Sequence, residues 1–233
     1  MFRRCGYALR RLEKNVSLVD PYLEQVRLVG SDCKTIFEVG AADGRDCKKY
    51  SELFPTAKLY AFEPVPESFE KVRQISISNP SIHALNMALS DKPGTAEFHI
   101  SNWHDESSLL KPQATGSTAD AYTASSKSIQ VTVDTIDQVC ERESISHINL
   151  LKMDAQGAEL RILNGAERML RSNSIDVIYT EVLFLEFYKQ TGRFDQIMKL
   201  LVENNFSLHN LYDLAHNQHG QLAHCDAIFI RNR

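Results

Sequence analysis

The sequence is short of cysteine, of long apolar runs and of an excess of either charge. It has five cysteines, and no two of them form a Cys-x-x-Cys pair. An odd, scattered set argues against a disulfide framework or a zinc site and indicates a reducing compartment. No stretch approaches the roughly 20 apolar residues of a membrane span, and no apolar core of a secretory signal follows the basic N-terminus. We therefore expect a cytoplasmic protein without an integral membrane segment.

The charge balance is mildly acidic, with a formal net charge of -4 over 233 residues. A chain of this charge lacks the basic surface of a general nucleic-acid-binding protein, so we expect no nucleic-acid partner. Hydrophobic residues make up 43% of the chain, which is ordinary for a folded domain that can bury a two-sided core.

The first 32 residues differ from the rest of the chain. They have helical spacing of apolar residues and an early basic face, which predicts a helical cap over residues 1–32 that packs on the main domain. A surface for acidic partners or lipid headgroups is the alternative interpretation.

Strands and helices alternate over residues 33–233, which we interpret as one domain. Short β-rich runs predict strands at 35–39, 58–62, 81–89, 148–153, 175–179, 206–212 and 225–230. Helical spacing predicts helices at 43–53, 66–75, 135–142, 157–171 and 194–203. This alternation predicts an α/β fold with a mostly parallel sheet of about seven strands and helices on both faces.

A polar insertion interrupts the alternation. Residues 95–100 and 128–133 both alternate apolar and polar side chains, as two strands of an extra ribbon would. The segment 101–127 between them is rich in Ser, Thr and Ala, and a polar loop of this length is usually functional or disordered. We predict a lid or substrate loop, with Trp103 and Tyr122 as closing contacts; plain disorder is the alternative.

The turn after the first predicted strand has the residues of a ligand site. In an open parallel sheet, ligands bind beyond the carboxyl ends of the strands. Gly40 permits a tight turn there, and Asp43 and Gly44 open the following helix. The loop lacks a Gly-x-Gly-x-x-Gly pattern, and Asp43 puts a negative charge where a pyrophosphate needs an uncharged cradle. It therefore favours a ligand with donors or positive charge over a dinucleotide.

An acidic residue ends the second predicted strand. Glu63 lies about 20 residues beyond the glycine turn, where a carboxylate accepts both hydroxyls of a ribose. Nicotinamide dinucleotides and S-adenosylmethionine both contain an adenosine ribose, so Glu63 indicates an adenosine ligand without choosing between them. A structural loop with a capping residue is the alternative.

Two further carboxylates follow later strands. Asp154 comes directly after the strand at 148–153, and the strand at 175–179 ends in Thr180 and Glu181. Two carboxylates that converge on a cleft can hold an ammonium group or take a proton from an attacking hydroxyl. Asp154 can also serve only as a helix cap, with Glu159 as a favourable first-turn acid.

These segments, in this order and spacing, resemble the FkbM family of S-adenosylmethionine-dependent methyltransferases. The segments that match the family are 37–44, 61–64, 86–91 with Gly94, 107–109, 131–137, and 151–159 with 164–166. The resemblance runs from about Lys34 to Val182. Two positions depart from the family pattern, because Gln156 replaces an acid and Glu38 replaces an aspartate. Gln156 therefore removes a charge near the active mouth, whereas Glu38 keeps its carboxylate.

The resemblance implies a Rossmann-like class I methyltransferase fold that binds S-adenosyl-L-methionine. It implies that Glu38 and Gly40 lie by the methionine part of the cofactor and Glu63 by the ribose. It further implies that Ala88 lies near the adenine and Asp154 near the sulfonium. The remaining predicted cofactor-site residues are Asp43, Gly44, Pro64 and Ser108.

The leading hypothesis is an O-methyltransferase that acts on a hydroxyl of a sugar or another secondary metabolite, a small-molecule or glycan acceptor. Asp154 and Glu181 are the candidate bases, and His104 is a further candidate or an exposed side chain without a role. The four histidines from residue 209 to residue 224 lack tight ligand spacing, so we expect no metal. The alternatives are a nicotinamide-dependent oxidoreductase and a non-catalytic module that binds an adenosine ligand.

Overall fold

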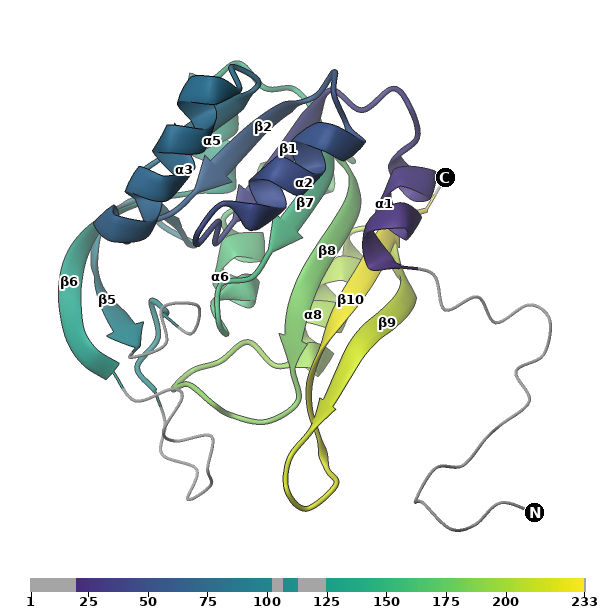
Figure 1. The fold of residues 1–233 in the computed structure, drawn as a ribbon. Helices are drawn as coiled ribbons and strands as arrows, with labels where there is room; N and C mark the ends of the chain where they lie inside the picture. Colours follow the sequence, from purple (N-terminus) through teal and green to yellow (C-terminus); the bar gives the residue numbers. More distant parts are fainter. Residues whose placement is uncertain (1–19, 102–106, 113–124, 233) are drawn as a thin grey trace, which may run out of the picture.

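The computed structural model describes residues 20–101, 107–112 and 125–232. Within these residues the main feature is a seven-stranded sheet in the order β3-β2-β1-β7-β8-β10-β9 (Figure 1). Its pairings are parallel from β3 to β8, whereas β10 runs antiparallel to both β8 and β9. The predicted α/β fold, with about seven mostly parallel strands, is confirmed.

The strands of this sheet have the following bounds. They are β1 (Thr35–Val39), β2 (Lys58–Phe62), β3 (Ile82–Leu85), β7 (Ile148–Met153), β8 (Ile175–Leu183), β9 (Phe206–His216) and β10 (Leu222–Arg231). β1 pairs in parallel with both β2 and β7, so the carboxyl ends of these three strands lie side by side at the lower edge of the sheet in Figure 1. That edge is where an open parallel sheet binds its ligands.

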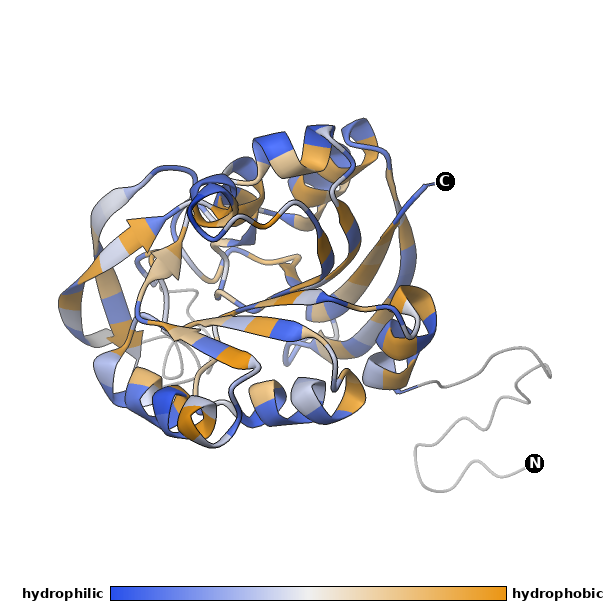
Figure 2. Cartoon of the chain, turned by 90° about the horizontal axis from the view of Figure 1, so that it is seen from above, coloured by the Kyte–Doolittle hydropathy of each residue, from blue (hydrophilic) through white to orange (hydrophobic). Residues whose placement is uncertain are grey.

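Helices cover both faces of the sheet, as predicted (Figures 1 and 2). One face packs against α1 (Pro21–Val29), α2 (Arg45–Leu53) and α3 (Pro66–Ser78). The other face packs against α5 (Ile136–Arg142), α6 (Glu159–Asn164), α7 (Glu167–Arg171) and α8 (Phe194–Glu203). Local capping helps to start these helices: the Asp20 carboxylate accepts the backbone N–H of Tyr22 at 2.8 Å, and Thr135 accepts that of Gln138 at 3.1 Å.

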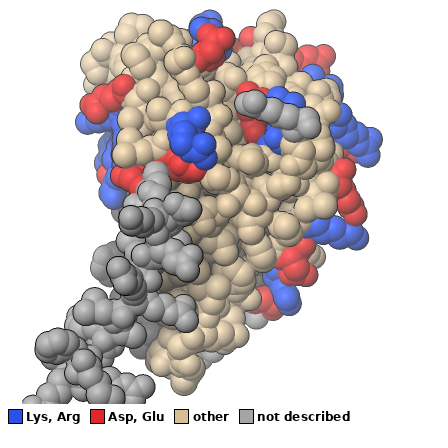
Figure 3. All heavy atoms as spheres, turned by 90° about the vertical axis from the view of Figure 1, so that its right-hand side faces the viewer, with Lys and Arg blue, Asp and Glu red and all other residues tan. Residues whose placement is uncertain are grey.

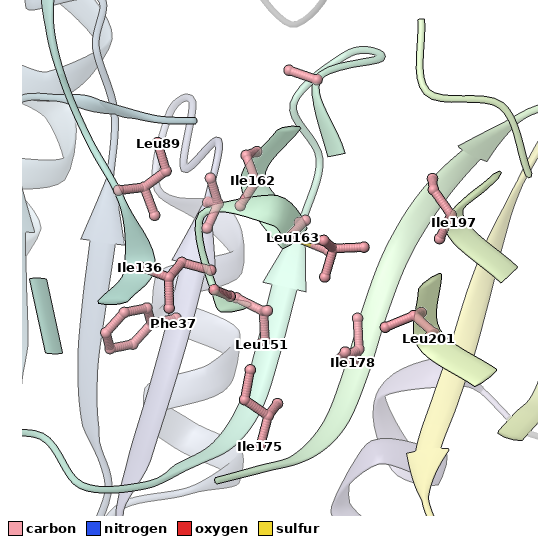
Figure 4. Close-up of a cluster of buried hydrophobic side chains, with 14 of the residues drawn as sticks. Phe37, Leu89, Ile136, Leu151, Ile162, Leu163, Ile175, Ile178, Ile197 and Leu201 are labelled. Carbon is pink, nitrogen blue, oxygen red and sulfur yellow. The ribbon is translucent and has the colours of Figure 1, made fainter. Parts of the chain in front are cut away.

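The larger hydrophobic core lies between the sheet and helices α5 to α8. Figure 4 shows Phe37 and Leu151 of the sheet facing Ile136, Ile162 and other apolar side chains of this helical layer. Phe37, Leu151, Ile136 and Ile162 are fully buried. Burying one such side chain contributes about 1.5–3 kcal/mol, so this core fixes the strand ends that form the site.

A second, three-stranded sheet stands beside the first. It has the order β4-β6-β5 and contains β4 (Ala88–Leu89), β5 (Gly94–Ser101) and β6 (Ser125–Asp134). β5 and β6 pair antiparallel, which confirms the predicted ribbon. Most of the predicted lid at 101–127 lies outside the described residues, together with Trp103, His104 and Tyr122, and the lid stays a prediction.

The helix α1 is the described part of the predicted N-terminal cap, whose residues 1–19 lie outside the described ranges. Its Tyr22 hydroxyl donates to Asp46 Oδ1 on α2 at 2.7 Å, and the Tyr22 ring packs edge-on against Tyr179 of β8. The buried Gln25 side chain accepts a hydrogen bond from Tyr50 at 2.8 Å. The cap over 1–32 stays a prediction, but α1 is packed directly against the elements that build the site.

Two predicted elements are divided in the structure. The helix predicted at 157–171 is broken into α6 and α7 around Gly165, where an added Cβ would lie 2.1 Å from the backbone oxygen of Ser90. The strand predicted at 81–89 is divided between the two sheets. Between its halves, Asn86 donates its side-chain amide to the backbone oxygens of Glu63 and Pro64 at 2.8 and 3.2 Å, which turns the chain away from β3.

The surface over α1 and the β9–β10 edge has no large region of one charge sign. Figure 3 shows acidic and basic side chains interspersed on this face around a broad uncharged area. None of the described helices combines the length and the apolar character that a bilayer crossing requires.

Candidate active site

A pocket of about 170 Å³ opens at the carboxyl ends of β1, β2 and β7. The small sheet closes one side of it through Ala88 and Phe98, and Leu109 adds a further wall. Seven of the predicted site residues line this pocket: Glu38, Gly40, Asp43, Glu63, Pro64, Ala88 and Asp154. The other three, Gly44, Ser108 and Glu181, lie outside the lining.

Gly40 holds the ends of β1 and β7 against each other. Its φ is +81°, and an added Cβ would lie 1.9 Å from the backbone oxygen of Asp154. The backbone N–H of Asp154 in turn donates to the Val39 carbonyl at 3.0 Å. Only glycine combines this backbone conformation with such a close approach, so Gly40 determines where Asp154 lies.

A buried charged cluster lies beneath the Gly40 turn. Lys152 Nζ is 3.9 Å from Glu38 Oε1 and 3.5 Å from Asp46 Oδ2. Burial raises the pKa of Glu38 to about 7, although Lys152 opposes the shift. Burial lowers the pKa of Lys152, but the carboxylates of Asp154, Glu38 and Asp46 outweigh it and leave that pKa above its usual range.

The Glu38 carboxylate lacks hydrogen-bond partners. Among the described residues, neither of its oxygens accepts a hydrogen bond of ordinary geometry, and its neighbours are the weakly donating Cys47 thiol and the Lys152 ammonium at 3.9 Å. A buried carboxylate in this state is costly, because burial removes water without supplying a replacement. The side chain can therefore accept hydrogen bonds from a ligand in the pocket.

Glu63 joins the two turns that flank the pocket. Its Oε2 accepts the backbone N–H of Ala42 at 2.8 Å, and its Oε1 accepts that of Val65 at 2.8 Å. The side chain is held in one orientation at the end of β2 and lines the pocket. The structural role that the sequence left open is present, because this carboxylate fixes both loops, and the ligand-binding role stays a prediction.

Asp43 and Gly44 lie at the start of α2. Asp43 faces the pocket but forms a two-pronged ion pair with Arg45, with contacts of 2.9 and 3.2 Å to Oδ2. The hydrogen bond from Arg45 lowers the pKa of Asp43. Gly44 is the N-cap of the helix, with φ of +77°, and an added Cβ there would lie 2.5 Å from Cδ1 of Ile75 on α3. The charge of Asp43 is thus largely balanced within its own turn.

The side-chain amide of Gln156 joins the two candidate bases. Its Nε2 donates to Asp154 Oδ1 at 2.8 Å and to Glu181 Oε2 at 3.2 Å, while its Oε1 accepts from the Tyr188 hydroxyl at 3.1 Å. The other oxygen of Glu181 pairs with Nδ1 of His224 at 3.3 Å. Glu181 lies within β8, which runs on to Leu183 and does not end at Thr180 and Glu181 as predicted.

Glu159 and Ser108 fix the loop that carries this network. Glu159 is buried, and its Oε1 accepts the backbone N–H of Ala155 at 2.8 Å. Burial and then the charge of Glu181 raise the pKa of Glu159. The buried Ser108 hydroxyl donates to the backbone oxygen of Gln156 at 2.8 Å, which ties the segment 107–112 to the same loop.

Two residues of this region are not predicted from the sequence to belong to the site. Lys152 lies in the strand Ile148–Met153, and a charge within so apolar a run is a signal that a buried partner exists. Gln156 replaces an acid of the family pattern, and its amide bridges two carboxylates. Two of the four histidines between residues 209 and 224 pair with separate carboxylates. His209 pairs with Glu24 at 2.6 Å, and His224 pairs with Glu181 at 3.3 Å. Within the described ranges, His, Cys, Asp and Glu form no group of three that could hold a metal ion.

Comparisons with known proteins agree with this arrangement. A family model described as the methyltransferase FkbM domain matches residues 38–208. The 2-O-methyltransferase NoeI of Sinorhizobium fredii is 27% identical over 197 residues, which cover 82% of this chain and 80% of that protein. The hexuronic acid methyltransferase AglP of Haloferax volcanii is 28% identical over 125 residues, covering 52% of this chain and 46% of that protein.

A solved structure of similar fold is that of StiE O-MT, which aligns with a TM-score of 0.54 at 11% identity. The alignment covers 91% of this chain and 73% of that chain, and at this identity it shows the fold alone. The family model covers most of the chain, including the turns after β1, β2 and β7 that build the pocket. The chain is therefore a methyltransferase of the FkbM family, as its motifs predict.

Proposed function

We propose that this protein transfers a methyl group from S-adenosylmethionine to a hydroxyl oxygen of a sugar or a similar small metabolite. The observation that supports this most is a strand-end pocket lined by Glu38, Glu63 and Asp154, with the Glu181 carboxylate joined to Asp154 through the Gln156 amide. The relatives named as a 2-O-methyltransferase and a hexuronic acid methyltransferase support a sugar hydroxyl as the acceptor.

The pocket residues fit the parts of the cofactor. The unpartnered, buried Glu38 carboxylate suits the ammonium group of its methionine end. Glu63, held by two backbone N–H groups, suits the ribose hydroxyls, and Ala88 leaves an apolar wall for the adenine. When bound, S-adenosylmethionine supplies a methyl group already activated by the sulfonium charge.

Asp154 and Glu181 orient the acceptor and take up its proton. Among the described residues, only Oδ1 of Asp154 is engaged, so Oδ2 is available to the acceptor hydroxyl. Glu181 has one oxygen on Gln156 and the other on His224, which makes it the second choice. A positioned base of this kind contributes about 10²–10⁴-fold to a rate, and alignment of the hydroxyl with the methyl group adds to that.

The test uses purified protein, S-adenosylmethionine and a panel of monosaccharides, uronic acids and oligosaccharides, with release of S-adenosylhomocysteine as the readout. Calorimetry should show binding of S-adenosylhomocysteine that NAD does not compete with. Binding of NAD alone would contradict the proposal and favour a nicotinamide-dependent oxidoreductase. Binding without turnover on any acceptor would support the non-catalytic module.

The Asp154→Asn variant tests the base. Asn keeps an oxygen for the Gln156 amide, and the predicted capping role of Asp154 is wrong because α6 begins at Glu159 with Ala158 as its N-cap, so the melting temperature should hold. Turnover should fall by roughly 10²–10⁴-fold, while S-adenosylhomocysteine still binds. The matched variant is Glu181→Gln; if it alone loses turnover, the proton goes to Glu181 instead.

A further inference from the structure

Gln156 lies between the two candidate bases and is held in place by several hydrogen bonds. Its Nε2 donates to Asp154 Oδ1 at 2.8 Å and to Glu181 Oε2 at 3.2 Å, and its Oε1 accepts from the Tyr188 hydroxyl at 3.1 Å. Its backbone oxygen accepts from the buried Ser108 hydroxyl at 2.8 Å. Because both amide N–H groups and the amide oxygen are engaged, the side chain is fixed in one orientation.

The backbone around Gln156 is constrained as well. Gln156 has φ of +52°, a left-handed conformation that non-glycine residues keep only where their surroundings require it. At Gly157, an added Cβ would lie 3.2 Å from the Tyr188 ring and 3.2 Å from the Thr191 hydroxyl. That hydroxyl donates to the backbone oxygen of Tyr188 at 2.7 Å, and Tyr188 is buried. The Gln156 loop and the segment that carries Tyr188 are therefore packed directly against each other.

A neutral donor suits this place because the two bases lie among other acids. An amide has two N–H donors and no charge, whereas a carboxyl group has one donor when protonated and none when ionised. Only the amide can therefore donate to both bases without adding a negative charge. The titratable groups that interact with Asp154 or Glu181 are Glu38 of β1, Lys152 of β7, Glu159 of α6, and His224, Cys225 and Asp226 of β10.

We propose that Gln156, oriented by Tyr188, is a positioning residue that holds the ionised carboxylates of Asp154 and Glu181 toward the acceptor, an inference that rests on the proposed function. Each amide N–H fixes one carboxylate oxygen, and Oδ2 of Asp154 is left for the acceptor hydroxyl. The Tyr188 hydroxyl binds the amide oxygen and so keeps it turned away from the two carboxylates, which would repel it.

The Gln156→Glu variant tests the need for a neutral donor, and Gln138→Glu makes the same change at an exposed position of α5. Carboxyl-carbon NMR on the ligand-free full chain follows the titration of each introduced carboxyl group. The group at position 156 should have its titration midpoint about 1–3 pH units above the group at position 138, because it faces two carboxylates. Equal midpoints would overturn the proposal, since a third negative charge would then be tolerated there.

Turnover of the same variant should depend on pH in a way that a merely structural role does not predict. Below its titration midpoint the introduced carboxyl keeps one donor, and above it the group has none. The ratio of Gln156→Glu to wild-type turnover should therefore fall about 10–100-fold from pH 5 to pH 9, the range for one hydrogen bond to a charged group. The ratio for Gln138→Glu should stay constant. A constant or rising ratio for Gln156→Glu would overturn the proposal.

Binding of S-adenosylhomocysteine separates this role from cofactor binding. Gln156 lies outside the pocket lining, so Gln156→Glu should bind S-adenosylhomocysteine within a few-fold of the wild type. A loss as large as the loss of turnover would overturn the positioning role. If the wild type methylates no acceptor, the proposed function fails, whereas the titration at position 156 still decides this inference.

The Tyr188→Phe variant tests how the amide is oriented. It keeps the buried ring and removes only the hydroxyl that donates to Gln156 Oε1. Turnover should fall about 2–10-fold at every pH, the range for a neutral hydrogen bond, and the pH dependence should stay that of the wild type. Full turnover in this variant would overturn the role of Tyr188.

Discussion

Replacing Gly40 with alanine tests whether the close contact of β1 with β7 positions the site. Gly40 has φ of +81°, and an alanine in this left-handed region costs about 1–2 kcal/mol by itself. The added Cβ would also lie 1.9 Å from the backbone oxygen of Asp154, whereas Cβ contacts under 3.0 Å are essentially never seen. The two strand ends must therefore separate by about 1 Å, and overpacking of this kind costs a further 1–3 kcal/mol or so.

The matched control is Gly220→Ala. Gly220 has nearly the same φ, +77°, but an added Cβ there meets nothing within 4 Å. Urea denaturation should therefore show a loss of about 1–2 kcal/mol for Gly220→Ala and about 2–5 kcal/mol for Gly40→Ala. The difference between the two variants isolates the contact with Asp154 from the backbone conformation.

The Gly40→Ala variant should also lose activity beyond its loss of stability. Asp154 moves with its backbone, and a misplacement of about 1 Å near the reacting atoms can cost about 10²-fold in rate. Turnover measured well below the melting temperature should therefore fall about 10²-fold, with Gly220→Ala unchanged. Equal stability losses in the two variants, or full turnover in Gly40→Ala, would refute this account of the turn.

Two further predictions concern the carboxylates of the pocket. The Glu63→Gln variant should weaken binding of S-adenosylhomocysteine by about 1.5–3 kcal/mol in calorimetry and lower the free energy of unfolding, because one of two backbone N–H groups then faces an amide N–H. Binding should also strengthen as pH rises. Because burial raises the pKa of Glu38 to about 7, an ammonium ligand must displace a proton below that pH, so affinity should increase about tenfold from pH 6 to pH 8.

In the ligand-free protein, the raised pKa of Glu38 makes stability fall, and not rise, as pH increases. The folded-state pKa lies above the ordinary value of 4.5, so the contribution of this group to stability is full below that value and is lost as pH rises through about 7. Lys152 stays charged throughout this window, so it does not reverse the sign. The Glu38→Gln variant is the control for both trends, and a pH dependence that survives in it would assign them to another group.

The sequence predicts most of the elements that build the pocket, because they depend on local patterns. The buried run Ile36–Val39 ending at Gly40, and the strand that ends at Glu63, are read from apolar residues followed by a turn signal. The family motifs then assign the methyltransferase fold. These features depend on residues close together in the chain.

The elements that the sequence misplaced depend on contacts between distant residues. The division of the helix at Gly165 follows from the close approach of Ser90, some 75 residues earlier, which no helical periodicity encodes. The extension of β8 to Leu183 follows from its antiparallel pairing with β10. The cluster of Lys152 with Asp46 likewise joins residues far apart in the chain, so the single charge in the strand could be noticed but not assigned a partner.

In the sheet, β10 lies between β8 and β9, but the ribosome makes β9 before β10. The sheet therefore cannot be completed strand by strand in the order of synthesis. β9 is synthesised before the strand that joins it to the sheet, since β10 pairs with both neighbours. Until residues 222–231 emerge, the nascent chain exposes the edge of the largely buried strand β8, and open edges of this kind pair readily with other chains. Chains paused between β9 and β10 therefore expose an unpaired strand edge of the kind that makes incompletely folded chains prone to aggregation.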